Sequence, residues 1–403
     1  MTYASDPLRS RAHVRWLAPA LGVVLAGALV ACGGNSDSNS GGGGSGGGTV
    51  KIGLAIGKTG YLAAVDNPFG NGVNLAVDYL NKNGGVNGKK FEVVTQDMQS
   101  NAAKAVPVTN QLINQQKVSV IIGGSTSAAT AADAPIIEPR KVPMIAASVL
   151  PPNSKWIFST LQPVSKTNQI DLDYVKSLKV TKVAVLYSQT PYGQGAAAAM
   201  GAAAKAGGLT VVASEAVETS ATDVTPQLSK AKAQGAQAII DVLSGPVHIV
   251  EAKGAATLNL DIPIVMGTDE VATFEPAAQA YPKAFLTAIA PQISPKNNDP
   301  QIKAANEKFL PIYQAAYADK PGIGNAGRGW DSVMILAEAI KASGATTGEE
   351  LRAALAKVNY TGTMSAYKFS ESDLTGQGST PNPLGIVKMN AGKLDVVYTP
   401  AAS

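Results

Sequence analysis

The sequence predicts an α/β protein of two doubly wound lobes, each a parallel sheet with helices on both faces, joined by three crossover segments. From Thr49 onward, apolar runs of strand length alternate with amphipathic stretches of helix length, which is typical of parallel sheets covered by helices. Residues 49–403 are too many for one compact core, so two domains are expected. Extended segments at 156–163 and 289–291 interrupt the alternation, and we interpret them as connections between the lobes.

The first half of the alternation opens with an apolar strand. Apolar residues then recur at helical spacing from Val73 to Leu80, and Gly84 with Gly85 ends that helix. A later, nearly all-apolar strand at 118–122 should be central and buried. The expected strands of this half are at 50–56, 91–95 and 118–122. The expected helices are one that ends at 83 and two more at 102–115 and 128–137.

The same alternation resumes after residue 181 and forms the second lobe. One of its helices is dominated by small residues, which allow close packing on a sheet, and its alanines favour helicity. The expected elements are strands at 182–187, 210–213, 238–242 and 262–266, helices near 195–206, 224–233, 247–256, 299–318, 331–342 and 348–357, and extended segments at 364–369 and 386–398. We therefore expect one lobe from residues 49–161 plus 292–365 and the other from 162–291 plus 366–403.

The single cysteine, Cys32, predicts where the protein resides. Three arginines and then an apolar segment at 17–30, too short to span a bilayer, form the pattern of a signal peptide over residues 1–31. Small residues before Cys32 resemble a bacterial lipobox, which implies cleavage there and acylation of the thiol; the alternative is an ordinary signal peptide with an incidental cysteine. Residues 32–48 are rich in glycine and serine and form a flexible linker. We expect a monomer in the periplasm or at the cell surface, held to the membrane by acylated Cys32.

Composition argues against catalysis, metal binding and nucleic-acid binding. The chain has only two histidines; His13 lies in the expected signal peptide, and His248 lies at the start of an apolar-rich helix, where a structural role is expected. Residues 322–327 match Gly-x-Gly-x-x-Gly but follow a helix, so we expect a flexible loop there and no phosphate site. Lysines are scattered mostly singly, without basic runs between aromatics. We therefore expect a protein that is not an enzyme and binds no cofactor, metal or nucleic acid.

Several short motifs, in order and spacing, carry a resemblance to a known family. They occupy residues 50–53, 59–60, 72–76, 81–89, 120–124 with Ser127, 191–195 and 266–269. Over residues 50–398 the chain resembles the leucine/isoleucine/valine-binding protein family, the type I periplasmic substrate-binding proteins of branched-chain amino acid ABC transporters. The resemblance implies the type I periplasmic binding fold, a small amino acid bound between two lobes, and an ABC permease as the partner.

The resemblance also implies ligand-binding residues, each with a plain structural alternative. Ser127 starts a helix after a buried strand, where backbone N–H groups attract an anion, and the family's serine there binds the ligand carboxylate; alternatively it is only an N-cap. Asp269 matches the family's acidic partner of the ligand ammonium, or is a turn aspartate. Tyr192 matches an aromatic residue that covers the ligand, or is a surface tyrosine.

Two departures from the family pattern leave the ligand open. Where the family has a ligand-contacting threonine, this chain has Leu150, and Ser148 offers a carbonyl or a hydroxyl instead. A family tyrosine is also missing near Ser244. A branched-chain or other hydrophobic amino acid is the expected ligand. The alternatives are an aromatic or aliphatic carboxylate, an amide or urea as ligand, or a ligand sensor in place of a transport component.

Overall fold

Strand β1 lies inside a five-stranded parallel sheet whose two faces carry different side chains. Ile52 and Leu54 pack toward helices α1 and α10, whereas Gly53 and Ala55 face α2, as alternation along a strand requires. The strand order is β2-β1-β3-β4-β5, with all neighbours parallel. The strands are β1 (Thr49–Ile56), β2 (Lys90–Asp97), β3 (Val120–Gly123), β4 (Met144–Ala146) and β5 (Ile157–Ser159).

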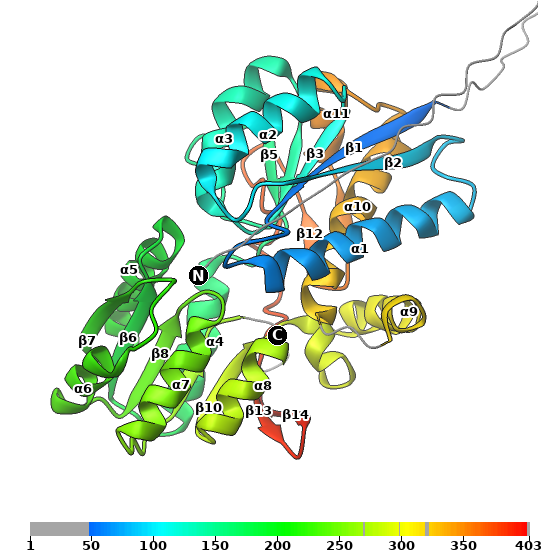
Figure 1. The fold of residues 1–403 in the computed structure, drawn as a ribbon. Helices are drawn as coiled ribbons and strands as arrows, with labels where there is room; N and C mark the ends of the chain where they lie inside the picture. The colour runs from blue at the N-terminus through cyan, green and yellow to red at the C-terminus, as the bar shows by residue number, and fades with distance from the viewer. Residues whose placement is uncertain (1–47, 269–270, 298, 319–321, 401–403) are drawn as a thin grey trace, which may run out of the picture. The chain divides into compact units, whose positions relative to one another are not determined.

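Helices cover both faces of this first sheet. On one face lie α2 and α3, and on the other α1 and α10 pack against each other (Figure 1). The elements associated with this sheet are α1 (Ala63–Lys82), α2 (Ala102–Asn114), α3 (Ser127–Arg140), the 3₁₀ helix η1 (Ala290–Lys296), α9 (Pro300–Tyr317), α10 (Ile323–Ser343), α11 (Gly348–Leu355), β11 (Asn359–Thr361) and β12 (Ala366–Lys368). Strands β11 and β12 pair antiparallel as a separate two-stranded sheet.

The second sheet has seven strands in the order β14-β13-β10-β9-β8-β6-β7. Neighbouring residues of β6 face opposite sides, since Val185 clusters with Ile170 of α4 and Leu186 clusters with Leu228 of α6. The strands are β6 (Lys182–Ser188), β7 (Thr210–Val217), β8 (Ala238–Val242), β9 (Ile264–Met266), β10 (Ala284–Ala288), β13 (Gly385–Asn390) and β14 (Lys393–Tyr398). The helices are α4 (Val164–Ser177), α5 (Pro191–Ala206), α6 (Thr225–Ala233), α7 (Val247–Thr257) and α8 (Val271–Ala280).

The computed structural model describes residues 48–268, 271–297, 299–318 and 322–400, which belong to one compact unit, Gly46–Ser403. The chain passes between the two large sheets after β5, after β10 and after β12. Strands β6 to β10 are parallel, and only β13 and β14 are antiparallel additions. The predicted α/β class, with two doubly wound sheets and three crossovers, is therefore confirmed.

The expected loop at 322–327 is wrong, because these residues form the first turns of α10. Gly322 adopts a φ of 115° just before the helix, and the glycines that follow let α10 approach α1 closely. A Cβ at Gly329 would lie 2.0 Å from the carbonyl oxygen of Phe69, and one at Gly72 would lie 1.9 Å from that of Ala326. Packing between two helix backbones therefore overrides the low helix propensity of glycine.

Other elements were missed or assigned differently. The expected extended segment at 289–291 is wrong for two of its three residues, because Ala290 and Pro291 form the first turn of the 3₁₀ helix η1 and only Ile289 is extended. Helices α4 and α8 and strands β4, β10 and β11 are not among the elements expected from sequence. The three strands are only three to five residues long, and their register depends on neighbours distant in sequence.

Candidate ligand-binding site

A cavity of about 230 Å³ lies at the carboxyl ends of the parallel strands. Its walls come from the segments that follow β1, β3 and β4 of the first sheet and β6, β8 and β9 of the second, together with α4 and the start of α10. Open α/β sheets bind ligands at this end of their strands. Because drug-sized ligands occupy about 300–1,000 Å³, this cavity suits a small solute.

One wall of the cavity is the N-terminus of α3, held in place by a buried aspartate. The carboxylate of Asp66 accepts hydrogen bonds from the N–H of Gly57 at 2.7 Å and of Ser125 at 3.0 Å. Burial raises the pKa of Asp66, although these two N–H bonds oppose the rise. A Cβ at Gly124 would lie 2.5 Å from this carboxylate, so only glycine fits there. No motif in the sequence indicates Asp66, which fixes the loop between β3 and α3.

Ser127 and its neighbour Thr126 line this wall. The hydroxyl oxygen of Ser127 accepts a hydrogen bond of 3.2 Å from the N–H of Val149, which leaves its own hydroxyl hydrogen to be donated. The side-chain oxygen of Thr126 is buried and has no hydrogen-bond partner among the described residues. Both hydroxyls therefore accompany the backbone N–H groups of the first helical turn, where an anion is favoured.

Ser148 lies behind the wall instead of in it. Its side chain is fully buried, with the hydroxyl 2.7 Å from that of Thr130, and its carbonyl accepts a 2.7 Å bond from the hydroxyl of Ser159. The residue before it, Ala147, is the one that lines the cavity. The structure therefore brings Ser127 to the cavity but gives the hydroxyl and carbonyl of Ser148 partners within the fold.

Tyr192 comes to the cavity from the second sheet, in the first turn of α5. Thr190 caps this helix, because its hydroxyl accepts a 3.1 Å bond from the N–H of Gly193, and Pro191 follows the cap. Burial and then the nearby Asp171 raise the pKa of Tyr192, so its hydroxyl stays protonated at neutral pH. The structure therefore places Ser127 and Tyr192 in the lining of the same cavity.

Two other predicted residues, Asp269 and Cys32, lie outside the described residues. Gly267 and Thr268, which precede Asp269 in the chain, do line the cavity. The N–H of Gly267 donates a 2.9 Å hydrogen bond to Asp241, so that carboxylate holds the backbone at Gly267.

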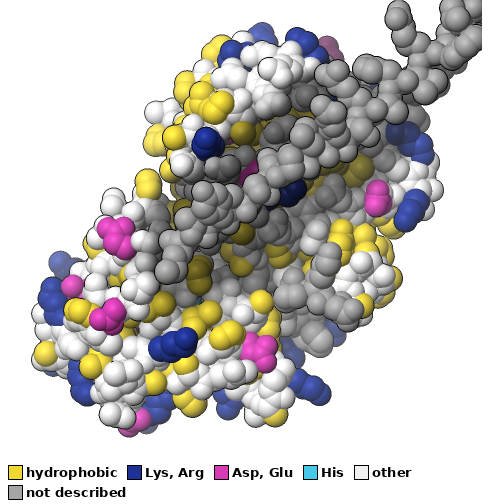
Figure 2. Space-filling view, viewed as in Figure 1, with side chains coloured by type: hydrophobic (Ala, Val, Ile, Leu, Met, Phe, Trp, Pro, Cys, Tyr) yellow, Lys and Arg dark blue, Asp and Glu magenta, His cyan; other side chains and the backbone are white. Residues whose placement is uncertain are grey.

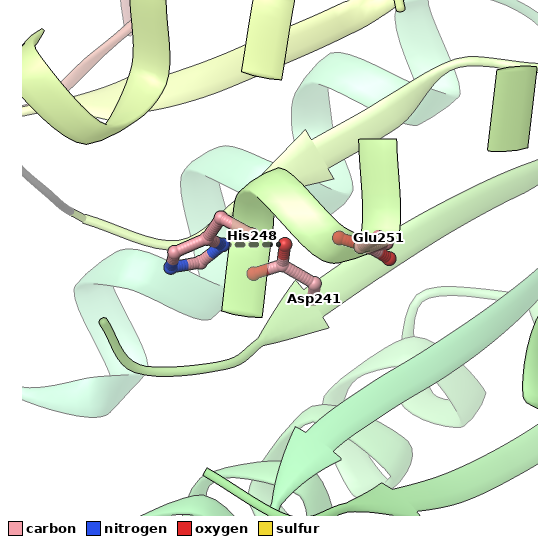
Figure 3. Close-up of side chains that lie close together, drawn as sticks. All are labelled: Asp241, His248 and Glu251. Carbon is pink, nitrogen blue, oxygen red and sulfur yellow. Dashed lines mark hydrogen bonds and ion pairs between the residues drawn. The ribbon is translucent and has the colours of Figure 1, made fainter. Parts of the chain in front are cut away.

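Asp241 belongs to a buried group with His248 and Glu251 (Figure 3). These side chains are 0–2% exposed, and Nδ1 of His248 lies 2.9 Å from Oδ2 of Asp241. Burial would raise the pKa of Asp241, but the charge and hydrogen bond of His248 outweigh it and lower the pKa. Burial and the adjacent Asp241 raise the pKa of Glu251 well above its ordinary value, so Glu251 holds a proton.

This group is the set of described residues whose nitrogen and oxygen atoms lie close enough to hold a metal ion, all within 4.8 Å of one another. The contact between His248 and Asp241 is a hydrogen bond, and burial beside Asp241 favours the protonated form of Glu251, from which a metal ion would have to displace the proton. Within the fold the arrangement has a structural effect. It fixes Asp241, which in turn bonds the N–H of Gly267 and, at 3.4 Å, that of Leu243 in the cavity wall.

Two further charged residues line the cavity and were not found from sequence. Arg328 of α10 is 4% exposed and donates hydrogen bonds to the side chains of Asn325 at 2.9 Å and Gln162 at 2.8 Å. Asp171 of α4 is 2% exposed. No motif marks either residue, because α4 was not predicted and the start of α10 was interpreted as a loop.

Charges of both signs are spread over the surface. On the face drawn in Figure 2, lysine and arginine side chains stand apart from one another among acidic, apolar and uncharged side chains. Within the part of the chain that the structure covers, no helix is both long enough and apolar enough to cross a membrane.

Comparison with known proteins agrees with this architecture. A family model described as periplasmic binding protein matches residues 49–393. The chain is 25% identical over 344 residues to the Leu/Ile/Val-binding protein BraC3 of Rhizobium johnstonii, covering 80% of this chain and 90% of that one. It is 27% identical over 299 residues to a leucine-, isoleucine-, valine-, threonine- and alanine-binding protein of Pseudomonas aeruginosa, covering 69% and 79% of the two chains.

Solved structures extend the likeness to the fold. The branched-chain amino acid transporter substrate-binding protein LivJ of Streptococcus pneumoniae, solved with isoleucine, matches with a TM-score of 0.70 and 28% identity over 87% of this chain and all of that one. An extracellular ligand-binding receptor of Rhodopseudomonas palustris HaA2 matches with a TM-score of 0.79 at 20% identity, over 87% and 99% of the two chains. The chain therefore belongs to the periplasmic binding protein family, and within it to the family of leucine/isoleucine/valine-binding proteins.

Proposed function

We propose that this protein is a lipid-anchored receptor that binds one small amino acid in the cavity and delivers it to an ABC permease. The observation that carries the proposal is the polarity of the cavity. The N-terminus of α3, with the hydroxyls of Thr126 and Ser127, forms one wall, and buried Asp171 and Asp241 belong to the segments of the second sheet. Such a cavity complements a zwitterion, with its carboxylate toward α3 and its ammonium toward the acidic side.

Individual roles follow from this orientation. Ser127 and the first N–H groups of α3 bind the carboxylate, and Tyr192 covers the ligand from α5. Asp269, which follows the cavity-lining Gly267 and Thr268, takes the ammonium group. Ser148 supports the wall through its bonds to Thr130 and Ser159. The relatives' names support an amino acid as the ligand, because one of those proteins is named for binding leucine, isoleucine and valine and the other also for threonine and alanine.

The two lobes expected from sequence close over the ligand by movement at the three crossovers, as in other hinged binding proteins. The closed form is the one that the permease binds. Acylation of Cys32 holds the receptor at the membrane; incorporation of labelled palmitate in a bacterial host, lost in Cys32→Ser, tests the anchor.

The test of binding is the thermal midpoint of the purified protein with amino acids, aliphatic and aromatic carboxylates, amides and urea. A ligand at about a thousand times its Kd stabilises the folded state by about 4 kcal/mol, which raises the midpoint by several degrees. Amino acids should produce this shift. A shift produced only by acids without an amino group, or only by amides or urea, would contradict the zwitterion and identify one of the alternative receptors.

Two substitutions test the roles. Asp269→Ala should weaken amino-acid binding by about 2–5 kcal/mol, because it leaves the ligand ammonium unpaired. Ser127→Ala should cost about 1.5–3 kcal/mol, the usual contribution of a hydrogen bond to a charged group. Asp261→Ala and Ser177→Ala are the matched controls, since neither residue lines the cavity. Equal affinities in Asp269→Ala and Asp261→Ala would remove Asp269 from the site.

A further inference from the structure

Helix α4 presents one stripe of side chains to the cavity. Val164, Thr167, Asn168 and Asp171 all line it, and their spacing of three, four and seven residues places them on one helix face. Asp171 is the charged member of this stripe. The neighbouring Asp173, two residues further along, does not line the cavity.

Asp171 has fewer hydrogen-bond donors than its carboxylate can accept. It is 2% exposed, and among the described residues its one donor is the hydroxyl of Thr287 on β10, which bonds Oδ1. A carboxylate has about four lone-pair positions, so most of its accepting capacity is unmet within the fold. An ionised carboxylate buried in this way is costly unless a further donor reaches it.

Charged and titratable groups surround Asp171 on the cavity side. They are Asp241 near the end of β8, whose partner is His248, together with Tyr192 of α5 and Arg328 of α10. Burial, and in smaller part the charge of Asp241, raises the pKa of Asp171 to about 8. In the absence of ligand, the carboxyl group is therefore largely protonated at neutral pH.

We propose that Asp171 determines specificity by binding a second hydrogen-bond donor of the ligand, an ammonium, amide or guanidinium group in its side chain. The inference rests on the proposed amino-acid receptor and names its ligand class: small polar or basic amino acids in preference to aliphatic ones. An aliphatic side chain at the same place leaves Asp171 buried without a new partner. The Kd of a ligand with a side-chain donor is therefore expected to be about ten- to a hundredfold lower than that of an aliphatic ligand of the same shape.

Pairs of ligands of equal shape provide the test. Leucine and asparagine have nearly the same outline, as do 2-aminopentanoate and 2,4-diaminobutyrate, but only the second of each pair carries a side-chain donor. Isothermal titration of the wild-type protein should give a Kd about ten- to a hundredfold lower for the donor-bearing member. In Asp171→Asn the advantage of 2,4-diaminobutyrate should shrink at least about tenfold, because the charge that pairs with its ammonium is removed. Asp173→Asn, on the same helix, should keep the wild-type ratios.

Proton exchange separates a ligand contact from a purely structural role. When the ammonium of 2,4-diaminobutyrate pairs with Asp171, the carboxyl group ionises and its proton leaves for the buffer. Titration at pH 7 in two buffers of different ionisation enthalpy should therefore show proton release for wild type and Asp173→Asn. Release should be absent in Asp171→Asn and smaller for 2-aminopentanoate.

The outcomes separate the inference from the function on which it rests. If wild type binds amino acids but favours leucine over asparagine, or if Asp171→Asn keeps the wild-type ratios, the role of Asp171 is refuted and the receptor stands. If no amino acid binds to wild type, the proposed function fails and the inference fails with it. If Asp171→Asn does not fold, the wild-type ligand ratios and proton release still decide.

Discussion

Replacing Asp241 with alanine would test whether the buried group at the end of β8 holds the cavity wall. The Asp241 carboxylate accepts 2.9 Å hydrogen bonds from Nδ1 of His248 and from the N–H of Gly267, and a longer one of 3.4 Å from the N–H of Leu243. Gly267 and Leu243 both line the cavity, so one carboxylate connects two wall segments to α7. Without this carboxylate, each of these N–H donors would remain buried and lose its acceptor.

The magnitude follows from the two short bonds. A buried donor without an acceptor costs about 1–3 kcal/mol, so losing the acceptor for His248 and Gly267 should destabilise the fold by about 2–6 kcal/mol. The 3.4 Å contact adds little. The charge of Asp241 is one cause of the raised pKa of Glu251. Removing that charge removes its repulsion of the Glu251 carboxyl group, which offsets part of the lost unfolding free energy.

Urea denaturation measures the effect, with Asp261→Ala as the control. The carboxylate of Asp261 is 92% exposed and pairs with Lys283, so its loss should change the unfolding free energy by less than about 1 kcal/mol. Asp241→Asn should lose less than Asp241→Ala, because the amide oxygen still accepts from Gly267. Unfolding free energies of Asp241→Ala and Asp261→Ala within about 1 kcal/mol of each other would refute the structural role.

Two other substitutions test packing and charge burial. Gly329→Ala places a Cβ 2.0 Å from the carbonyl oxygen of Phe69, so it should lower the unfolding free energy in urea by about 3 kcal/mol or more. The control Gly201→Ala has open space around the new Cβ and should be neutral or stabilising by up to about 1 kcal/mol. Equal effects of the two substitutions would contradict the close approach of α10 to α1. Burial raises the pKa of Asp133 from 3.8 to about 6. Between these two pH values the folded chain keeps a proton that the unfolded chain releases, so the unfolding free energy falls as the pH rises from about 4 to about 6. Asp133→Asn should therefore gain up to about 3 kcal/mol over wild type between pH 4 and pH 7, and a pH-independent difference would count against the raised pKa.

Local pattern predicted most of the regular elements. Strand β3 is a continuous apolar run and β1, β6 and β8 are mostly apolar, and such runs flanked by glycine or polar turns indicate buried parallel strands. The helices with clear apolar spacing were found to within a few residues at most ends. The missed strands are short, and α4 carries polar residues on the face that lines the cavity. Its apolar periodicity is correspondingly weaker.

The candidate site was only partly predictable. The helix start after a buried strand and the family resemblance together indicated Ser127, whereas the resemblance alone indicated Tyr192, because the helix that contains it was expected to begin only near residue 195. Asp66, Asp171 and Arg328 carry no such signal, because nothing in their neighbouring residues distinguishes them from surface charges. Their role depends on burial, which arises only when elements far apart in sequence pack together.

The sequence by itself determined the α/β class, the alternation of strands and helices, and the small inventory of histidine and cysteine that argues against metal and thiol chemistry. Those properties depend on residue type and spacing along the chain. Only the tertiary structure decided that α10 begins at Ile323, that Ser148 lies behind the cavity wall, and that Asp171 and Arg328 line it. Each of these results depends on how closely segments distant in sequence approach and bury one another. That tertiary environment sets the pKa of a carboxyl group and the space for a ligand, and the local sequence does not.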